Sequence, residues 1–100
     1  FEAGGAKVMY APGLTTLEQL REVTGAISRP FNVLAPLFGD ATVEDFANAG
    51  AQRISVGSAL TWAALNPLLK GAGEMLEHGT FGWLGELASS KKISELLSAD

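Results

Sequence analysis

The chain has 100 residues, a formal net charge of -4 and no cysteine. Its 7 lysine and arginine residues form no basic stripe for a phosphate backbone, so we expect no nucleic-acid partner, and the missing thiols exclude disulfides and thiolate metal sites. The longest apolar stretch, residues 59–69, is interrupted by Thr61, Asn66 and Pro67 and is too short to cross a bilayer, so we expect no membrane partner and a cytoplasmic location.

Hydrophobic residues make up 47% of the sequence, a high fraction for so short a chain. A chain of this size cannot bury all of its apolar side chains, and a contiguous apolar surface marks a contact site. We therefore expect part of this surface to meet the rest of a larger fold or another subunit.

Short apolar segments alternate with capped helices, and this order predicts a parallel sheet. The segments cover residues 8–13, 31–36 and 54–58, and each is followed by a helical pattern. Parallel strands need a crossover connection, usually a helix, so the succession indicates an α/β fold. Ligands of such folds gather at the carboxyl ends of the strands, which here are Pro12 and Gly13, residues 32–36, and Gly57 with Ser58.

The first crossover helix is predicted to begin at Thr15, with Glu18 completing a capping box. Its apolar residues recur at helical spacing and should cover the sheet; they are Leu17, Leu20, Val23 and Ile27. Pro30 then stops the helix, because proline lacks the amide hydrogen that a continuing helix would use.

The second crossover helix is predicted to begin at Thr42, with Asp45 in the same capping relation, and to end at Gly50. We expect it to bury Val43, Phe46 and Ala47.

Residues 2–8 and 48–54 form a weak internal repeat in which Gly4 aligns with Gly50. Each copy predicts a helix end, a left-handed glycine, a basic residue and a buried strand. The first copy would make Phe1 to Gly4 the last turn of a helix. Because three parallel strands alone leave both sheet edges open, we expect the chain to be the carboxyl-terminal part of a larger protein.

After the third segment the pattern is wholly helical. At Asn66 and Pro67 either a new helix begins, with Asn66 as its cap, or one helix continues with a proline kink. The helix is predicted to end at His78 and Gly79, with Thr80 capping the next segment. A last amphipathic turn presents Ile93, Leu96 and Leu97.

Four segments together resemble the isocitrate lyase and phosphoenolpyruvate mutase superfamily, and more narrowly a bacterial branch of it. They are residues 11–14 (APGL), 29–34 (RPFNVL), 49–60 (AGAQRISVGSAL) and 77–81 (EHGTF). The resemblance covers the whole chain in order, and residues 49–60 carry its most specific part. It implies the last three strands of a (β/α)8 TIM barrel with their helices over residues 1–79, and a carboxyl-terminal helical tail over residues 80–100.

Members of this superfamily hold small 2-oxo acids or their enolates on Mg²⁺ and make or break a neighbouring C–C or P–C bond. The resemblance therefore implies a lyase or phosphonomutase that acts on a small 2-oxo acid or phosphonate. It also implies that the acidic metal ligands and the carboxylate-binding arginine come from earlier strands. We accordingly expect no catalytic residue and no metal ligand in this chain, and no turnover by the isolated chain.

The resemblance places Asn32 on the penultimate strand, where superfamily members carry a polar residue that faces the substrate. Its amide could bind a carboxylate oxygen, or could simply satisfy neighbouring backbone groups. Ser55 has the same parity as Gly57 and points either into the barrel or into packing. Pro12 and Gly13 follow the carboxyl end of the first strand, so we expect them to line the same barrel mouth and to bind substrate. Metal-binding members often carry an acidic residue at this place, where residues 11–13 are Ala-Pro-Gly.

Gly57 and Ser58 permit two interpretations. Their backbone N–H groups, at the mouth of the last strand, could bind a phosphate, or Gly57 could only allow close packing of the following helix. An unrelated phosphate-binding TIM barrel therefore stays an alternative. A second alternative is a segment for assembly: the resemblance implies a homo-oligomer, a dimer or tetramer, whose carboxyl-terminal helices exchange between subunits.

Overall fold

A computed structural model describes residues 1–98. These residues form two compact units that divide after Leu60. The division at residue 79 that the sequence predicts concerns the place of each segment in a whole barrel and stays a prediction.

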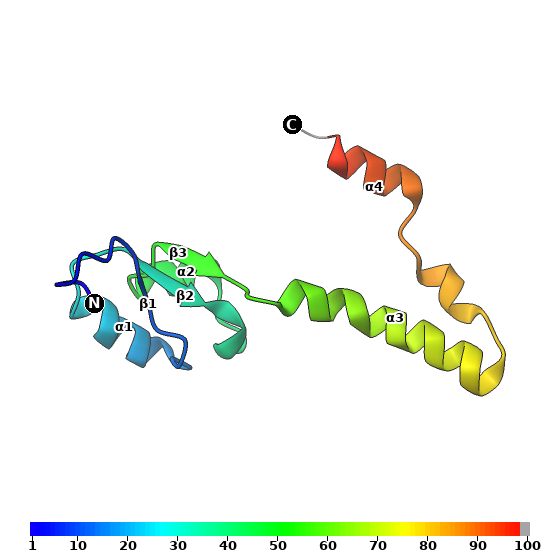
Figure 1. The fold of residues 1–100 in the computed structure, drawn as a ribbon, viewed down its shortest axis with the longest axis horizontal. Coiled ribbons are helices and arrows are strands. Elements are labelled where there is room, and N and C mark those ends of the chain that lie inside the picture. The colour runs from blue at the N-terminus through cyan, green and yellow to red at the C-terminus, as the bar shows by residue number, and fades with distance from the viewer. Residues whose placement is uncertain (99–100) are drawn as a thin grey trace. The chain divides into compact units, whose positions relative to one another are not determined.

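The first unit contains a parallel sheet of three strands in the order β1-β2-β3 (Figure 1). The strands are β1 (Met9–Tyr10), β2 (Phe31–Leu34) and β3 (Arg53–Ser55). Helix α1 (Leu17–Gly25) connects β1 to β2, and helix α2 (Val43–Asn48) connects β2 to β3. The predicted alternation of strands and crossover helices is confirmed.

Each strand ends earlier than the sequence predicts, because local backbone geometry ends the sheet. Pro12 has no N–H to donate to a ladder, and a turn replaces the end of the first segment. After β2 the chain enters the 3-10 helix η1 (Ala35–Leu37), with Pro36 in its first turn. Gly57 has a φ of 55°, a left-handed conformation that an extended strand cannot contain.

The core lies between one face of the sheet and the two helices. Leu20 of α1, Phe31 and Val33 of β2, and Phe46 of α2 are buried there. The rings of Phe38 and Phe46 meet edge to face, with centroids 5.2 Å apart. The other residues of the predicted α1 stripe pack against this core, which confirms that α1 covers the sheet; they are Leu17, Val23 and Ile27.

Helix α2 turns a different face inward than predicted. Phe46 is buried as expected, but Val43 and Ala47 are exposed, and Ala49 takes their place in the core. Because α2 has only six residues, Phe46 is its one buried side chain, and Val43 and Ala47 lie on other sides of the helix.

Both crossover helices begin with capping boxes, although the first lies one residue later than predicted. Thr16, and not Thr15, is the N-cap of α1: its hydroxyl accepts from the Gln19 amide, and the Gln19 side chain accepts from the Thr16 amide. The predicted partner Glu18 is therefore wrong. At α2 the predicted pair of Thr42 and Asp45 is confirmed, with the Thr42 amide donating to Asp45 Oδ2 over 2.8 Å.

The internal repeat is a repeated turn, which follows helix α2 in the second copy and stands without a described helix in the first. Gly5 and Gly50 both have a φ of 93°, so Gly5, and not the predicted Gly4, corresponds to Gly50. In both copies the amide after the glycine donates back to the first residue of the turn, from Ala6 to Phe1 and from Ala51 to Phe46. This hydrogen bond defines a Schellman motif, which directs the chain from a helix end into the next strand.

The second unit is helical. Helix α3 (Ala59–His78) continues through Pro67, so the interpretation of one continuous helix is correct. It ends as predicted at His78, where Gly79 has a φ of 64°. No helix among residues 1–98 combines the length and the apolar character needed to cross a membrane.

Glu74 of α3, and not Thr80, caps the 3-10 helix η2 (Gly82–Glu86). Its carboxylate accepts from the Thr80 hydroxyl over 2.8 Å and from the amides of Gly82 and Trp83 over 2.6 and 3.2 Å. The Trp83 ring lies against Gly71, where an added Cβ would come within 3.1 Å of the indole. The contact of α3 with η2 thus combines a polar cap with an aromatic ring on a glycine.

Helix α4 (Ser90–Leu97) closes the described part of the chain. The Ser89 hydroxyl caps it by accepting from the Lys92 amide over 3.2 Å. Ile93, Leu96 and Leu97 recur at the predicted helical spacing and are all exposed.

The Glu74 cap predicts a measurable pH dependence. Hydrogen bonds from Thr80, Gly82 and Trp83 lower the pKa of Glu74 below its ordinary value of 4.5. Because the folded pKa is depressed, the cap stabilises η2 above the unfolded pKa, and this stabilisation is lost as the pH falls through the folded pKa. We expect the amide signals of Gly82 and Trp83 to titrate below pH 4.5 in NMR spectra.

Glu74→Gln should abolish this titration and raise the exchange rate of both amides. Glu77→Gln is the matched control, because Glu77 is exposed and its one ion pair among residues 1–98 is with His78, over 3.9 Å. Identical titrations in the wild type and in Glu74→Gln would contradict the assignment of the cap.

Candidate functional site

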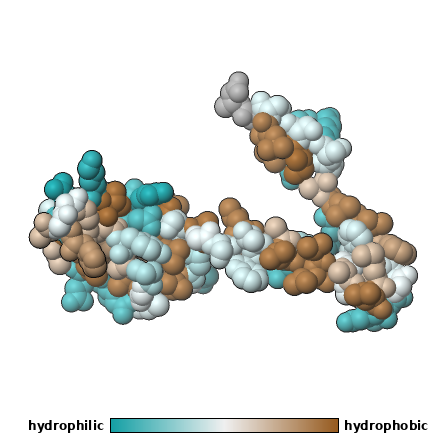
Figure 2. Space-filling model, in the orientation of Figure 1, coloured by the Kyte–Doolittle hydropathy of each residue, from teal (hydrophilic) through white to brown (hydrophobic). Residues whose placement is uncertain are grey.

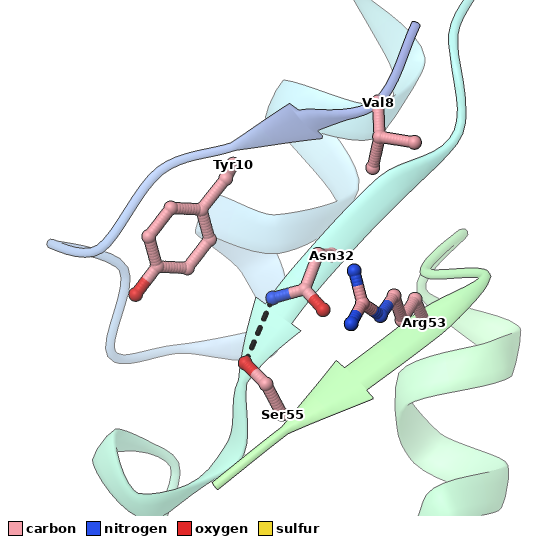
Figure 3. Close-up of a pocket in the computed structure, with 5 residues that line it drawn as sticks. All are labelled: Val8, Tyr10, Asn32, Arg53 and Ser55. Carbon is pink, nitrogen blue, oxygen red and sulfur yellow. Dashed lines mark hydrogen bonds between the residues drawn. The ribbon is translucent and has the colours of Figure 1, made fainter. Parts of the chain in front are cut away.

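The face of the sheet opposite the helices carries a cavity of about 410 Å³ (Figure 3). Its lining comes from all three strands: Val8, Tyr10, Asn32, Arg53 and Ser55. Side chains alternate between the two faces of a strand. Since Phe31, Val33 and Ile54 contribute to the packed core, the residues between them belong to this open face.

Three polar side chains form one row across the sheet. In the strand register Tyr10 pairs with Asn32, and Asn32 pairs with Arg53. Neighbouring strands lie about 4.8 Å apart. The Tyr10 phenol, the Asn32 amide and the Arg53 guanidinium therefore start from backbone positions that are about this distance apart. We call these three residues the polar row; Figure 3 shows them facing the cavity.

Asn32 is the one buried polar residue among those described, with an exposed fraction of 8%. Its Nδ2 donates to Ser55 Oγ over 2.8 Å and approaches the Val33 carbonyl oxygen at 3.4 Å. The Ser55 hydroxyl in turn donates to the same carbonyl over 3.4 Å. Since a carbonyl only accepts hydrogen bonds, the approach to Val33 favours the orientation in which the NH₂ group of Asn32 faces Ser55.

The same contacts leave Asn32 Oδ1 without a partner. Within residues 1–98 this atom is buried and accepts no hydrogen bond. A buried polar atom without a partner costs about 1–3 kcal/mol, so such atoms are uncommon in folded proteins. Ser55 therefore holds Asn32 in the orientation that keeps an unused acceptor at the cavity.

Arg53 contributes the positive charge of the cavity. Its guanidinium makes no ion pair with any acidic group in residues 1–98, and no acidic side chain lines the cavity. A guanidinium recognises carboxylates and phosphates through paired N–H donors. The electrostatics of the cavity thus favour an anion.

The predicted site residues do not all meet at this cavity. Asn32 and Ser55 line it and contact each other, whereas Pro12, Gly13, Gly57 and Ser58 lie in the turns after β1 and β3 and are not part of its lining. The proposed roles of these four residues stay predictions. Gly57 at least has a conformational reason to be glycine, because its φ is positive.

Sequence reasoning missed Tyr10 and Arg53. The alternation that pairs Ser55 with Gly57 also places Arg53 on the same face, so the signal for Arg53 was present in the sequence. Tyr10 precedes the turn at Pro12, and its place in the row depends on the register of β1 against β2. That register is set by tertiary pairing.

The described residues do not fit a metal site. Within residues 1–98 no three histidine or acidic side chains come close enough together to hold a metal ion. The Glu74 carboxylate accepts hydrogen bonds at the start of η2, and His78 approaches one acidic side chain, that of Glu77, so neither belongs to a set of metal ligands. The cavity offers one amide oxygen and two hydroxyls as oxygen ligands, without a carboxylate.

Comparisons with known proteins agree with this architecture. The family model of phosphoenolpyruvate phosphomutase matches residues 1–76. A crystal structure described as a "putative lyase/mutase" from Burkholderia cenocepacia J2315 is similar, with a TM-score of 0.85 and 36% sequence identity. The match covers 98% of this chain and 36% of that chain, so this chain spans about a third of the length of its structural relative. The search of curated proteins found no match.

The three parallel strands with their crossover helices are thus part of a lyase/mutase barrel of the TIM type. The chain belongs to the phosphoenolpyruvate phosphomutase family. The resemblance to the isocitrate lyase and phosphoenolpyruvate mutase superfamily is confirmed, and an unrelated phosphate-binding barrel is no longer an alternative.

The contact between Asn32 and Ser55 can be tested by substitution. Ser55→Ala removes the acceptor of Asn32 Nδ2, and we expect a loss of about 1 kcal/mol in the free energy of unfolding. The side-chain NH₂ signals of Asn32 should broaden or move in NMR spectra. Ser55→Thr is the control, because it keeps the hydroxyl; unchanged Asn32 signals in Ser55→Ala would contradict the contact.

Proposed function

We propose that this chain is the carboxyl-terminal part of a Mg²⁺-dependent lyase or phosphonomutase that acts on a small 2-oxo acid or its enolate. The polar row on the open face of the sheet is the observation that carries this proposal. The family match supports the class of enzyme, and the residues of the row support an anionic organic substrate.

In this proposal the chain provides one wall of the active site. Arg53 attracts the anionic group, Asn32 and Tyr10 offer hydrogen bonds beside it, and Ser55 fixes the orientation of Asn32. Helices α1 and α2 hold the three strands from behind through the apolar core, so the side chains of the row start from a rigid surface.

Mg²⁺ belongs to the proposal as a ligand of residues other than those described here, since residues 1–98 gather no set of metal ligands. When bound, such an ion would stabilise negative charge on an enolate oxygen. The residues of this chain would position the organic acid and exclude water from one side of it. A cytoplasmic location is part of the same proposal.

The proposed reaction can be tested on the full-length protein. We expect turnover with Mg²⁺ and at least one member of a panel of 2-oxo acids and phosphonopyruvate, and loss of turnover after EDTA treatment. The isolated chain of residues 1–100 is the control and should be inactive, since it lacks a metal site among its described residues. Turnover by the isolated chain, or activity that EDTA leaves unchanged, would contradict the proposal.

A second function, assembly with another copy of the protein, is favoured by the exposed apolar side chains of the second unit. Figure 2 shows apolar areas over the helical part of the chain. The exposed residues include Trp62, Leu68, Leu69, Leu76, Phe81, Leu87, Leu96 and Leu97. Monomeric proteins rarely expose so many large apolar side chains in one short segment. We propose a homo-oligomer, a dimer or tetramer, in which these helices exchange between subunits.

Light scattering after size-exclusion chromatography tests the assembly. We expect the full-length protein to be a dimer or tetramer and Leu76→Glu to weaken its association by about tenfold or more, because a charge replaces an apolar contact. Val43→Glu is the matched control: Val43 is 72% exposed and Leu76 is 88% exposed, but Val43 lies in the first unit. A monomeric, fully active wild type would rule out an essential exchange of helices.

A further inference from the structure

We propose that Gln52 is a positioning residue for Asn32: it fixes the register of β2 against β3 and thereby holds the Asn32 amide at the cavity. This inference rests on the proposed function, in which Asn32 offers hydrogen bonds to the substrate. It assigns a role in the reaction to a residue outside the lining of the cavity, which acts only through other residues.

Gln52 pairs with Phe31 twice. The Gln52 amide donates to the Phe31 carbonyl oxygen over 3.1 Å, and the Phe31 amide donates to Gln52 Oε1 over 3.0 Å. The first contact is a backbone pairing of the kind that joins parallel strands. In the second, a side-chain oxygen takes the place of a backbone carbonyl, because the chain just before Gln52 is still in the turn at Gly50, whose φ is 93°. Gln52 therefore closes the amino end of the pairing between β2 and β3.

The register of these two strands depends on such a contact. A tight turn sets the register of a hairpin, whereas β2 and β3 are parallel and are connected through α2. Strand β3 has three residues, so three backbone pairs hold it against β2, and Gln52 extends this short ladder to Phe31. A slip of β3 by one residue would turn Ser55 away from Asn32, since side chains alternate between the two faces.

The turn before Gln52 is itself fixed against α1. The Thr24 hydroxyl donates to the Ala49 carbonyl oxygen over 2.7 Å. A Cβ atom added at Gly50 would lie 2.5 Å from Thr24 Oγ1, so the turn approaches α1 as closely as a glycine allows. The backbone of Gln52 thus starts from a packed position, and its side chain transmits that position to Phe31.

Asn32 is held at two points that both depend on this pairing. It directly follows Phe31, and its Nδ2 donates to Ser55 Oγ, which lies three positions after Gln52, over 2.8 Å. With an exposed fraction of 8%, Asn32 has little room to compensate for a displaced backbone. A shift of about 1 Å in a group that positions a substrate can cost about 100-fold in rate. Loss of the Gln52 contact should therefore reach the reaction through Asn32.

Three substitutions in the full-length protein test this role. Gln52→Met keeps the length of the side chain and removes the acceptor, whereas Gln52→Glu keeps an acceptor. Gln19→Met is the matched control, because Gln19 Oε1 also accepts a backbone amide over 3.0 Å, from Thr15, but at the start of α1. Gln52 and Gln19 are both exposed, so neither methionine variant opens a cavity in the core.

NMR spectra give the exchange rate of the Phe31 amide and the side-chain NH₂ signals of Asn32. Kinetics give kcat and KM for a member of the panel that the wild type turns over. In Gln52→Met we expect exchange of the Phe31 amide to be at least tenfold faster, the Asn32 signals to move, and kcat to fall about tenfold. KM should change less than kcat, because the binding groups are still present and only their placement differs.

Gln52→Glu should stay within about threefold of the wild type in kcat and should restore the slow exchange of the Phe31 amide. Gln19→Met should lower the melting temperature and leave the Asn32 signals, kcat and KM within about twofold of the wild type. Gln52→Asn, which is one methylene shorter, is a second variant and should change the same quantities in the same direction as Gln52→Met.

Unmoved Asn32 signals in Gln52→Met and Gln52→Asn would overturn the inference. So would an equal fall of kcat in Gln19→Met, which would assign the effect to a general loss of stability. The NMR measurements need no turnover. An active Gln52→Met with wild-type Asn32 signals contradicts this inference alone, whereas a wild type that turns over no member of the panel contradicts the proposed reaction alone.

Discussion

The alternation of side chains along three parallel strands is the constraint on which the structure depends. Helices α1 and α2 cover one face, where the strands place the apolar side chains of Met9, Phe31, Val33 and Ile54. The other face carries no helix of the first unit and presents the polar row of Tyr10, Asn32 and Arg53. Residues that pack in the core and residues that face the cavity therefore alternate along each strand. A shift of one position in the register of a strand would move each set to the other face of the sheet.

The connections preserve this separation by fixing where each strand begins. The turns at Gly5 and Gly50, which share one hydrogen-bond pattern, lead the chain into β1 and β3. At the second motif the Thr24 hydroxyl donates to the Ala49 carbonyl over 2.7 Å, which ties the end of α1 to the end of α2. Gln52 then pairs with both backbone groups of Phe31, and this places Arg53 opposite Asn32. The position of the charged residue is thus a consequence of turn geometry.

Much of this architecture could be predicted from local patterns. The parallel α/β order, the face of α1, the capping box at Thr42 and the helix end at Gly79 each depend on residues that are close in sequence. The errors at Thr15 and Gly4 are shifts of a single position between neighbouring candidates. The error at Thr80 has another cause, because Glu74 reaches η2 from the preceding turn of α3 and supplies a charged acceptor. A charged acceptor makes stronger hydrogen bonds than a hydroxyl.

The sequence by itself determined the fold class, the family and two of the polar residues of the cavity, Asn32 and Ser55. These follow from the order and spacing of strands, helices and motifs, which can be read in the linear sequence. Only the tertiary structure decided that Arg53 and Tyr10 stand beside Asn32, and that Ser55 occupies the NH₂ end of its amide and leaves Oδ1 unpaired. The reason is physical: neighbours across a sheet are set by register, and hydrogen-bond partners by side-chain direction.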